Sequence, residues 1–290
     1  MGQWELRPLS LGEILDRTFS LYRNNFILFL GITAIPHLLT LGLNLLQALT
    51  MTVPAAINRP HARHFQVGGM SGGLLAFGLV GGLIGLIVYV VTYLFAQGGT
   101  IYAVSDIYLG RSTTIGASLR KMWGQLANLF GVSLLNGCAI LVSALFLLIP
   151  GIYVACRLLT CVPAALLEDL GARESLERSW DLTRGNAGRS FVIYLLYLAM
   201  LYGILMLFLI PFTVMAAMSV KDPGIMKSSL ILMQFGSFLA QVLVGPFFLI
   251  ATSVFYYDLR VRKEAFDLQM MMNPIAARDT GNPNVPPVLS

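Results

Sequence analysis

Long runs of apolar residues without a single charge restrict the fold of this chain more than any other feature. A run of about 18 or more such residues is long enough to cross the hydrocarbon core of a bilayer as one helix. Four runs of this kind cover residues 26–53, 72–105, 191–220 and 228–257. Only 11% of the residues are charged, against roughly a quarter in an ordinary soluble domain. We therefore expect an integral membrane protein.

A further apolar region follows Met122 and is interrupted by Pro150-Gly151. Because proline breaks a helix and glycine permits a tight turn, we interpret the region as a helical hairpin that turns at this pair. Its two arms are predicted at 126–149 and 152–167. The expected fold class is thus all-α, a polytopic membrane protein with six transmembrane helices.

The domain organisation follows from these six spans. Residues 1–268 are predicted to form a single membrane domain. The last segment, 269–290, is rich in Pro, Asn and other polar residues and is predicted to be a disordered tail.

The distribution of Lys and Arg predicts the orientation in the membrane, because short cytoplasmic segments carry an excess of both. The amino-terminal segment, the second connection, the fourth connection and the carboxy-terminal segment hold three, three, four and four of them. The three connections on the other side hold two, none and two. We therefore expect a multi-pass protein of the inner (plasma) membrane with both termini in the cytoplasm.

One charged segment occurs twice in the chain. EILDRTFSLYRNN at 13–25 and ESLERSWDLTRGN at 174–186 align without gaps, and ASLRKMWGQL at 117–126 is a weaker third copy. Each copy precedes a pair of apolar runs. The pattern indicates three pseudo-repeats, each an interfacial amphipathic helix followed by a transmembrane hairpin.

The predicted interfacial helices combine a charged face with a large aromatic residue. The first begins with Ser10-x-x-Glu13, the signature of a capping box. Phe19, Trp123 and Trp180 are the expected interfacial anchors, since such helices lie in the plane of the membrane surface. A structural collar around the spans is the main interpretation, and a regulatory or partner-docking role is the alternative.

Three blocks carry a resemblance to a known family. They are RPLSLGEILDRTFSLYRNNF, PGIYVACRLLTCVPAALLEDLGARESLERSWDLTRGN and YYDLRVRKEAFDL. Together they resemble a prokaryotic family of uncharacterised membrane proteins related to the membrane domain of glycerophosphoryl diester phosphodiesterases, over roughly residues 6 to 268. The resemblance implies a six-span inner-membrane protein of a bacterium or archaeon.

No enzymatic activity is expected. A phosphodiesterase barrel of that family would need a couple of hundred soluble residues, and such a segment is not found in this sequence. Motifs of the GxxxxGK[ST], HExxH and CxxC types do not occur either. We predict neither a catalytic residue, nor a cofactor, nor a metal site.

Arg157 is the one charge inside a predicted span. An intramembrane charge is costly and by default functional, so Arg157 is the candidate contact for a lipid phosphate or another anion. The structural alternative is that its guanidinium binds carbonyl groups freed by Pro150 or Pro163. The family resemblance also includes an Arg after the Pro-Gly turn.

Glu168 and Asp169 end the same apolar region and form a candidate pair at the cytoplasmic boundary. The common interpretation is that they cap the next helix or pair with Arg173. The alternative is a role of these two carboxylates in proton coupling.

Three minor features favour structural explanations. His61 and His64 in the first outer connection form a loose pair for which a solvated loop is the main interpretation and weak metal binding the alternative. The three cysteines fall inside spans, where packing is the usual role. Gly78-x-x-x-Gly82 predicts close helix packing.

The function favoured by the sequence is non-catalytic: an accessory, scaffold or lipid-interacting membrane protein. The expected partners are membrane lipids, in particular anionic ones, and a protein partner is possible, whereas nucleic acid is not expected. The alternative is a small-molecule or lipid transporter with a polar cavity that reaches Arg157.

Overall fold

The protein is described by a computed structural model at residues 7–50, 72–218 and 223–264. The His61–His64 pair and the 269–290 tail lie outside these residues. Within them the secondary structure is helical, without strands. The helices in chain order are α1 (Leu11–Asn24), α2 (Phe26–Thr50), α3 (Gly72–Tyr108), α4 (Ile115–Phe146), α5 (Leu148–Arg157), α6 (Cys161–Leu167), α7 (Ala172–Leu182), α8 (Ala187–Met218) and α9 (Pro223–Glu264).

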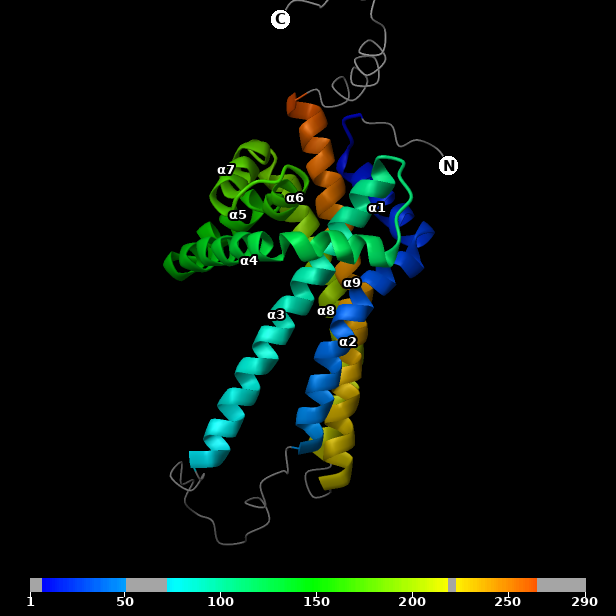
Figure 1. Ribbon diagram of the computed structural model, residues 1–290, viewed down its shortest axis with the longest axis vertical. Helices are drawn as coiled ribbons and strands as arrows, with labels where there is room; N and C mark the ends of the chain where they lie inside the picture. The colour runs from blue at the N-terminus through cyan, green and yellow to red at the C-terminus, as the bar shows by residue number, and fades with distance from the viewer. Residues whose placement is uncertain (1–6, 51–71, 219–222, 265–290) are drawn as a thin grey trace, which may run out of the picture.

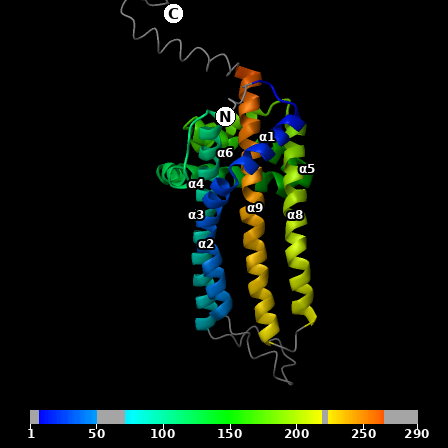
Figure 2. The ribbon, with the colours of Figure 1, turned by 90° about the vertical axis from the view of Figure 1, so that its right-hand side faces the viewer.

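Four helices, α2, α3, α8 and α9, run along the long axis of the molecule (Figures 1 and 2). Six helical segments have the length and composition of membrane spans: these four, α4, and α5 together with α6. Because a bilayer satisfies no backbone hydrogen bonds, such apolar segments can span it only as helices. The predicted fold class is confirmed, and the chain is a multi-pass membrane protein.

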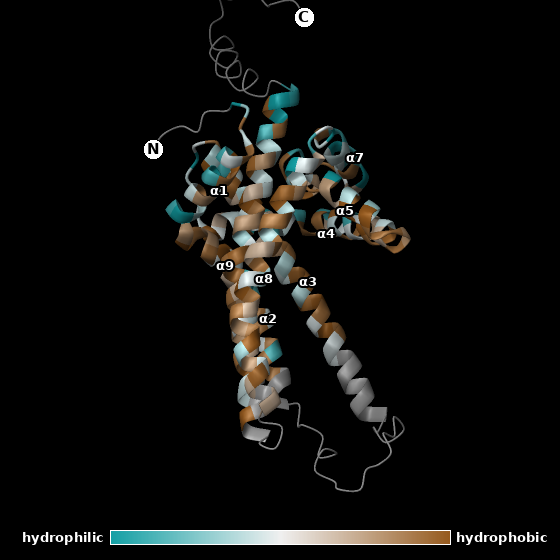
Figure 3. Ribbon diagram, turned by 180° about the vertical axis from the view of Figure 1, so that it is seen from behind, coloured by the Kyte–Doolittle hydropathy of each residue, from teal (hydrophilic) through white to brown (hydrophobic). Residues whose placement is uncertain are grey.

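The fifth and sixth candidates have a different direction. α4 lies across the long helices at one end of the molecule, and α5, α6 and α7 lie at the same end (Figures 1 and 2). α1 and the carboxy-terminal end of α9 also lie there. Figure 3 shows that hydrophilic residues gather at this end, whereas the long helices are mostly apolar. We call it the polar end. The predicted hairpin is present, but its first arm is not parallel to the long helices.

The hairpin turns three residues earlier than the sequence predicted. α4 ends at Phe146, and Leu147 has an extended backbone with φ −165° and ψ 144°. Pro150 lies in the first turn of α5, where a missing N–H costs nothing. Gly151 permits close contact between the arms, because a Cβ there would lie 2.7 Å from Cα of Ala144. The Pro-Gly pair therefore begins the second arm and does not form the turn.

The third repeat copy also differs from expectation. No separate interfacial helix forms at 117–126; these residues are the start of the continuous helix α4, which Thr114 caps by accepting a hydrogen bond from the Ala117 amide at 3.3 Å. Between Trp123 and the following apolar run only Gly124 disfavours a helix, at a cost of about 1 kcal/mol. That cost is too small to stop a helix 32 residues long.

The other two copies do form short helices, α1 and α7. α1 begins with the predicted capping box: the Ser10 hydroxyl accepts from the Glu13 amide at 3.3 Å, and the Glu13 carboxylate accepts from the Ser10 amide at 2.7 Å. α7 has half of this arrangement, in which Glu174 accepts from the Gly171 amide at 3.1 Å. Glu174 thus caps the helix, while Arg178, four residues further on, pairs with Glu168.

Glycines on α3 let α4 cross it. A side chain at Gly98 would overlap Met122 of α4, and a Cβ at Gly99 would lie 3.1 Å from Leu119. By contrast, a Cβ at Gly82, in the predicted close-packing motif, would meet no described atom within 4 Å. The close approach is therefore made 16 residues further along α3, at the adjacent Gly98 and Gly99, which form no Gly-x-x-x-Gly motif.

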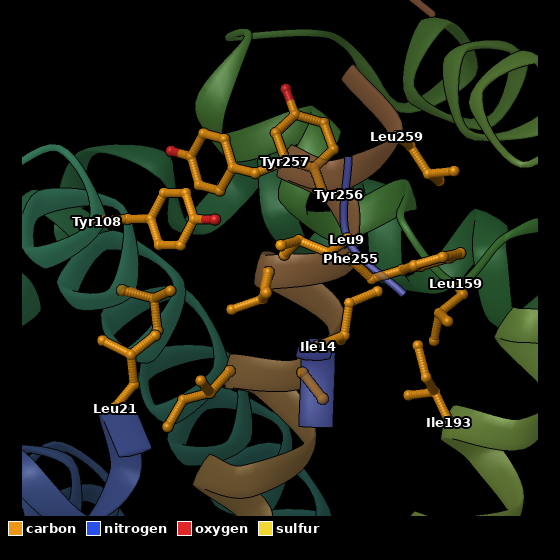
Figure 4. Close-up of a cluster of buried hydrophobic side chains, with 14 of the residues drawn as sticks. Leu9, Ile14, Leu21, Tyr108, Leu159, Ile193, Phe255, Tyr256, Tyr257 and Leu259 are labelled. Atoms are coloured by element: carbon orange, nitrogen blue, oxygen red, sulfur yellow. The ribbon is translucent and has the colours of Figure 1, made fainter. Parts of the chain in front are cut away.

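The largest buried cluster also lies at the polar end (Figure 4). It joins α1, the end of α3, α6 and the last third of α9, with Leu9 of the amino-terminal segment inserted among them. Tyr108 and Tyr257 stack in this cluster with ring centroids 4.9 Å apart. The polar end is therefore a packed body that holds the candidate site residues in fixed positions.

Candidate functional site

Arg157 lies at the end of α5 and is only 5% exposed. Its Nη2 donates a hydrogen bond to the Trp180 carbonyl at 2.5 Å, and its Nη1 donates to the Tyr153 hydroxyl at 3.3 Å. The guanidinium carbon lies 4.4 Å from the centroid of the Trp180 ring and 5.8 Å from that of Tyr153. Cation–π attraction to both rings therefore helps to hold the buried charge.

The described residues provide no counter-charge for Arg157. No carboxylate among the described residues lies within ion-pair distance of Arg157, and its Nε is buried without a hydrogen-bond partner. The carbonyl that Arg157 binds belongs to the last turn of α7, where the helix dipole supplies roughly half a negative charge. Half a charge does not balance a full buried one, so the site keeps an excess of positive charge.

A break in the helix positions Arg157. α5 ends at this residue and α6 begins at Cys161, with Pro163 in its first turn. The break frees the Arg157 carbonyl, which accepts hydrogen bonds from the hydroxyls of Ser179 at 2.9 Å and Thr183 at 2.8 Å. The structural alternative was thus partly right: Arg157 does bind a carbonyl, but one at the end of α7 and not one freed by a proline of its own hairpin.

This arrangement also explains which face of α7 is buried. Ser175, Ser179, Leu182 and the adjacent Thr183 are buried, whereas Trp180 is 39% exposed. Ser179 and Thr183 face inward because they bind the Arg157 carbonyl, whereas Ser175 binds the carbonyls of Leu170 and Gly171. The sequence of α7 alone does not indicate the contact with Arg157.

Glu168 is the centre of an ion-pair network. It accepts two hydrogen bonds from Arg178, at 2.8 and 3.0 Å, and one from the Tyr256 hydroxyl at 2.5 Å. Arg178 and Arg260 both also contact Glu264 of α9. The network ties α6 and α7 to α9 with two cations for two carboxylates. The partner of Glu168 is therefore Arg178, and not Arg173 as one interpretation proposed.

Asp169 points elsewhere. Its φ is +52°, in the left-handed region that an aspartate tolerates better than most residues, and its Oδ1 accepts from the Gln125 amide at 3.2 Å. Arg173, the other proposed partner, pairs with Glu177 at 2.9 Å. Glu168 and Asp169 are thus adjacent in sequence but do not act as a pair.

The three predicted anchors are all large exposed side chains at the polar end. Phe19, Trp123 and Trp180 are 58%, 73% and 39% exposed. Their neighbours at the preceding position, Thr18, Met122 and Ser179, are each fully buried. Each repeat copy therefore presents one aromatic residue outward next to one buried residue.

An open groove of about 520 Å³ lies between α4, α5 and α7. The Trp180 ring stacks on the Arg157 guanidinium and also lines this groove, whereas Arg157 itself does not line it. The groove is lined by Ala139, Val154, Leu158, Leu176, Glu177, Trp180 and Asp181. It is mainly apolar, unlike the polar cavity that a transport pathway would need.

Sequence reasoning missed a second buried charge, Asp258. Its carboxylate is completely buried and accepts from Arg189 at 2.8 Å, from Arg262 at 3.1 Å and from the Leu9 amide at 2.6 Å. Both arginines also donate to the Leu9 carbonyl. The available signals were its position at the end of the last apolar run and Arg262 four residues further on, but the other two partners are 69 and 249 residues away in sequence.

Most hydroxyl side chains within the long helices bind carbonyls of their own helix, and two pairs of polar side chains link one long helix to another. Thr40 and Thr92 are 2.9 Å apart, and the Asn44 amide donates to Gln234 at 3.5 Å. Such interhelical hydrogen bonds stabilise membrane helix packing. Cys156 and Cys161 are buried free thiols, consistent with packing.

Comparison with known proteins places the chain in a family. No curated protein and no solved structure matches it. A family described as a domain of unknown function (DUF7847) matches residues 74–259. This region contains α4 to α8 and most of α3 and α9, including Arg157, Glu168 and Asp258. Since it covers more than half of the chain, the protein belongs to this family of uncharacterised proteins.

Proposed function

We propose that this protein is a non-catalytic, lipid-interacting protein of the inner (plasma) membrane, and that the positive charge at Arg157 binds an anionic lipid. One observation carries the proposal: Arg157 is buried without a carboxylate partner among the described residues, while its Nε keeps an unused donor. A buried guanidinium of this kind suits a phosphate, which accepts several charge-assisted hydrogen bonds.

The position of Arg157 supports a lipid as the source of that phosphate. The site lies at the polar end, beside the exposed aromatic anchor Trp180, whose ring centroid is 4.4 Å from the guanidinium carbon. Aromatic residues of this type are enriched at the level of lipid headgroups. The basic residues of the polar end favour its placement in the cytoplasm, with both termini, where anionic headgroups attract them.

Two finer expectations belong to the same proposal. The short helices α1 and α7 and the start of α4, which contain the three repeat copies, would form a collar around the spans, supported by the shared pattern of an exposed aromatic residue beside a buried one at Phe19, Trp123 and Trp180. The relation to the membrane domain of glycerophosphoryl diester phosphodiesterases rests on the sequence resemblance alone. The transport alternative has less support, because the groove near Arg157 is mainly aliphatic.

Lipid analysis of the purified protein tests the proposal. The full chain is extracted in native lipid particles, and the lipids that accompany it are identified by mass spectrometry. We expect an anionic lipid in stoichiometric amount that is lost in Arg157→Leu and retained in Arg173→Leu, whose arginine is an exposed residue paired with Glu177. Identical bulk lipid in all three samples would overturn the proposal and favour a scaffold with protein partners.

A further inference from the structure

Two further cations lie next to Arg157. The ammonium of Lys263, at the end of α9, donates to the Asp181 carbonyl at 2.5 Å, one residue after the carbonyl that Arg157 binds. The same Asp181 carbonyl accepts a hydrogen bond from the backbone amide of Arg184 at 3.2 Å, and the charges of Arg157 and Arg184 both repel the Lys263 ammonium, while Asp181 attracts it. Arg157, Arg184 and Lys263 therefore form one cluster around the carboxy-terminal end of α7, which we call the basic cluster.

The basic cluster is not neutralised by the described residues. None of its three members has a carboxylate within ion-pair distance there, and Asp181 is the one acid that acts on Lys263. Three cations and one carboxylate leave two positive charges in excess. Arg184 and Lys263 are exposed, so an anion can reach them without a rearrangement of the buried Arg157.

The apolar groove between α4, α5 and α7 meets this cluster. Trp180 and Asp181, whose carbonyls bind Arg157 and Lys263, also line the groove. The other carboxylate of the lining, Glu177, is paired with Arg173 at 2.9 Å. An aliphatic groove that ends at an excess of positive charge matches a molecule with an apolar chain and an anionic head.

We infer that the groove holds an acyl chain of one anionic phospholipid, whose phosphate is bound by Lys263 and Arg184 above the buried Arg157. This inference rests on the proposed function and makes it specific: it names the class of lipid, the two exposed contacts and the place of the chain. The ring of Trp180 lies between the phosphate site and the groove and touches the bound lipid.

Fluorescence quenching of Trp180 tests the inference. The full chain with Trp4→Phe and Trp123→Phe keeps Trp180 as its one tryptophan. It is reconstituted in phosphatidylcholine vesicles with 10% phosphatidylglycerol, in which either lipid carries the bromine atoms on its acyl chains, at equal mole fraction of brominated lipid. We expect stronger quenching by brominated phosphatidylglycerol, and no change with added inorganic phosphate.

Variants locate the two halves of the site. The preference for phosphatidylglycerol is expected to fall about fivefold for each of Lys263→Gln and Arg184→Gln, the factor that corresponds to about 1 kcal/mol per basic residue near an anionic surface. Ala139→Leu fills the groove and is expected to reduce quenching while the anionic lipid still accompanies the protein. Arg120→Gln, at an exposed arginine of α4 that does not line the groove, is the matched control and is expected to change neither.

The outcomes are distinct. Equal quenching by both brominated lipids, or a preference that persists without Lys263 and Arg184, overturns the inference. Displacement by inorganic phosphate also overturns it, since the site would then bind a free ion. If lipid analysis shows an Arg157-dependent anionic lipid and Trp180 shows no preference, the proposed function stands and the groove is not the lipid site. If the experiments show neither an Arg157-dependent anionic lipid nor a lipid preference at Trp180, the proposed function is overturned as well.

Discussion

Replacement of Asp258 by Asn is expected to destabilise the protein more than any exposed charge replacement. The Asp258 carboxylate has no solvent exposure, and it holds Arg189 and Arg262 together with the amide of Leu9. Asn keeps the shape of the side chain but carries no charge, and its NH₂ group cannot accept a hydrogen bond from either guanidinium. Two partly buried cations would then face each other without an anion.

The expected magnitude follows from burial. Removal of one partner of a buried ion pair costs about 3–5 kcal/mol, since the remaining charge stays desolvated. Glu177→Gln is the matched control, because Glu177 and its partner Arg173 are 65% and 88% exposed. Exposed pairs contribute about 0–1 kcal/mol. The two substitutions thus remove the same kind of charge and differ in its surroundings.

Reversible unfolding in mixed detergent micelles, followed by circular dichroism, measures the two free energies of unfolding. We expect a loss of at least about 3 kcal/mol for Asp258→Asn and less than about 1 kcal/mol for Glu177→Gln. Protease digestion adds a local measure, because the segment around Leu9 is held by this clamp and should be cut faster in Asp258→Asn. Equal losses in the two variants would refute the reasoning, since burial would then have no effect on the value of the charge.

Three other substitutions test the packing and the electrostatics of the polar end. Gly151→Ala should lower the free energy of unfolding in detergent by about 1–3 kcal/mol, because the new Cβ would lie 2.7 Å from Ala144. Gly137→Ala is the control and should not lower it, since a Cβ at Gly137 meets no described atom within 4 Å. A larger loss for Gly137→Ala than for Gly151→Ala would contradict the hairpin packing. Tyr256→Phe removes the hydroxyl that binds Glu168 and should cost about 1–3 kcal/mol; an unchanged free energy of unfolding would exclude this contact from the network. The hydrogen bond from the Ser10 amide, and after it the one from Arg7, lowers the pKa of Glu13 to about 2. The stability that the Glu13 carboxylate contributes is therefore present above its unfolded pKa of about 4.3 and is lost as pH falls toward 2. ¹³C NMR of the labelled carboxylate should show a titration midpoint near pH 2, and a midpoint near about 4.3 would contradict the capping box.

Local sequence was sufficient to predict the features that depend on neighbouring residues. The apolar runs predicted the long helices, and Ser10-x-x-Glu13 predicted the start of α1, because a capping box is made within four residues. All of these features require only the chain within one or two helical turns.

Features that depend on distant residues were missed or misplaced. The partner of Glu168 is ten residues away and lies on another helix, so the nearer Arg173 was an equally good choice by sequence. The clamp around Asp258 joins three segments that only the folded chain brings together. The direction of α4 depends on where α3 lacks side chains, at Gly98 and Gly99, and hydropathy carries no information on such a crossing.

Native mass spectrometry tests the central claim, that the uncompensated charge at Arg157 binds an anionic lipid, most directly. The protein is released from nanodiscs that contain equal amounts of phosphatidylglycerol and phosphatidylcholine, and the lipids that stay bound are counted by mass. We predict one retained phosphatidylglycerol on the unmodified protein, none on Arg157→Gln, and one on Arg173→Gln. The same number and type of retained lipids on all three proteins would contradict the claim.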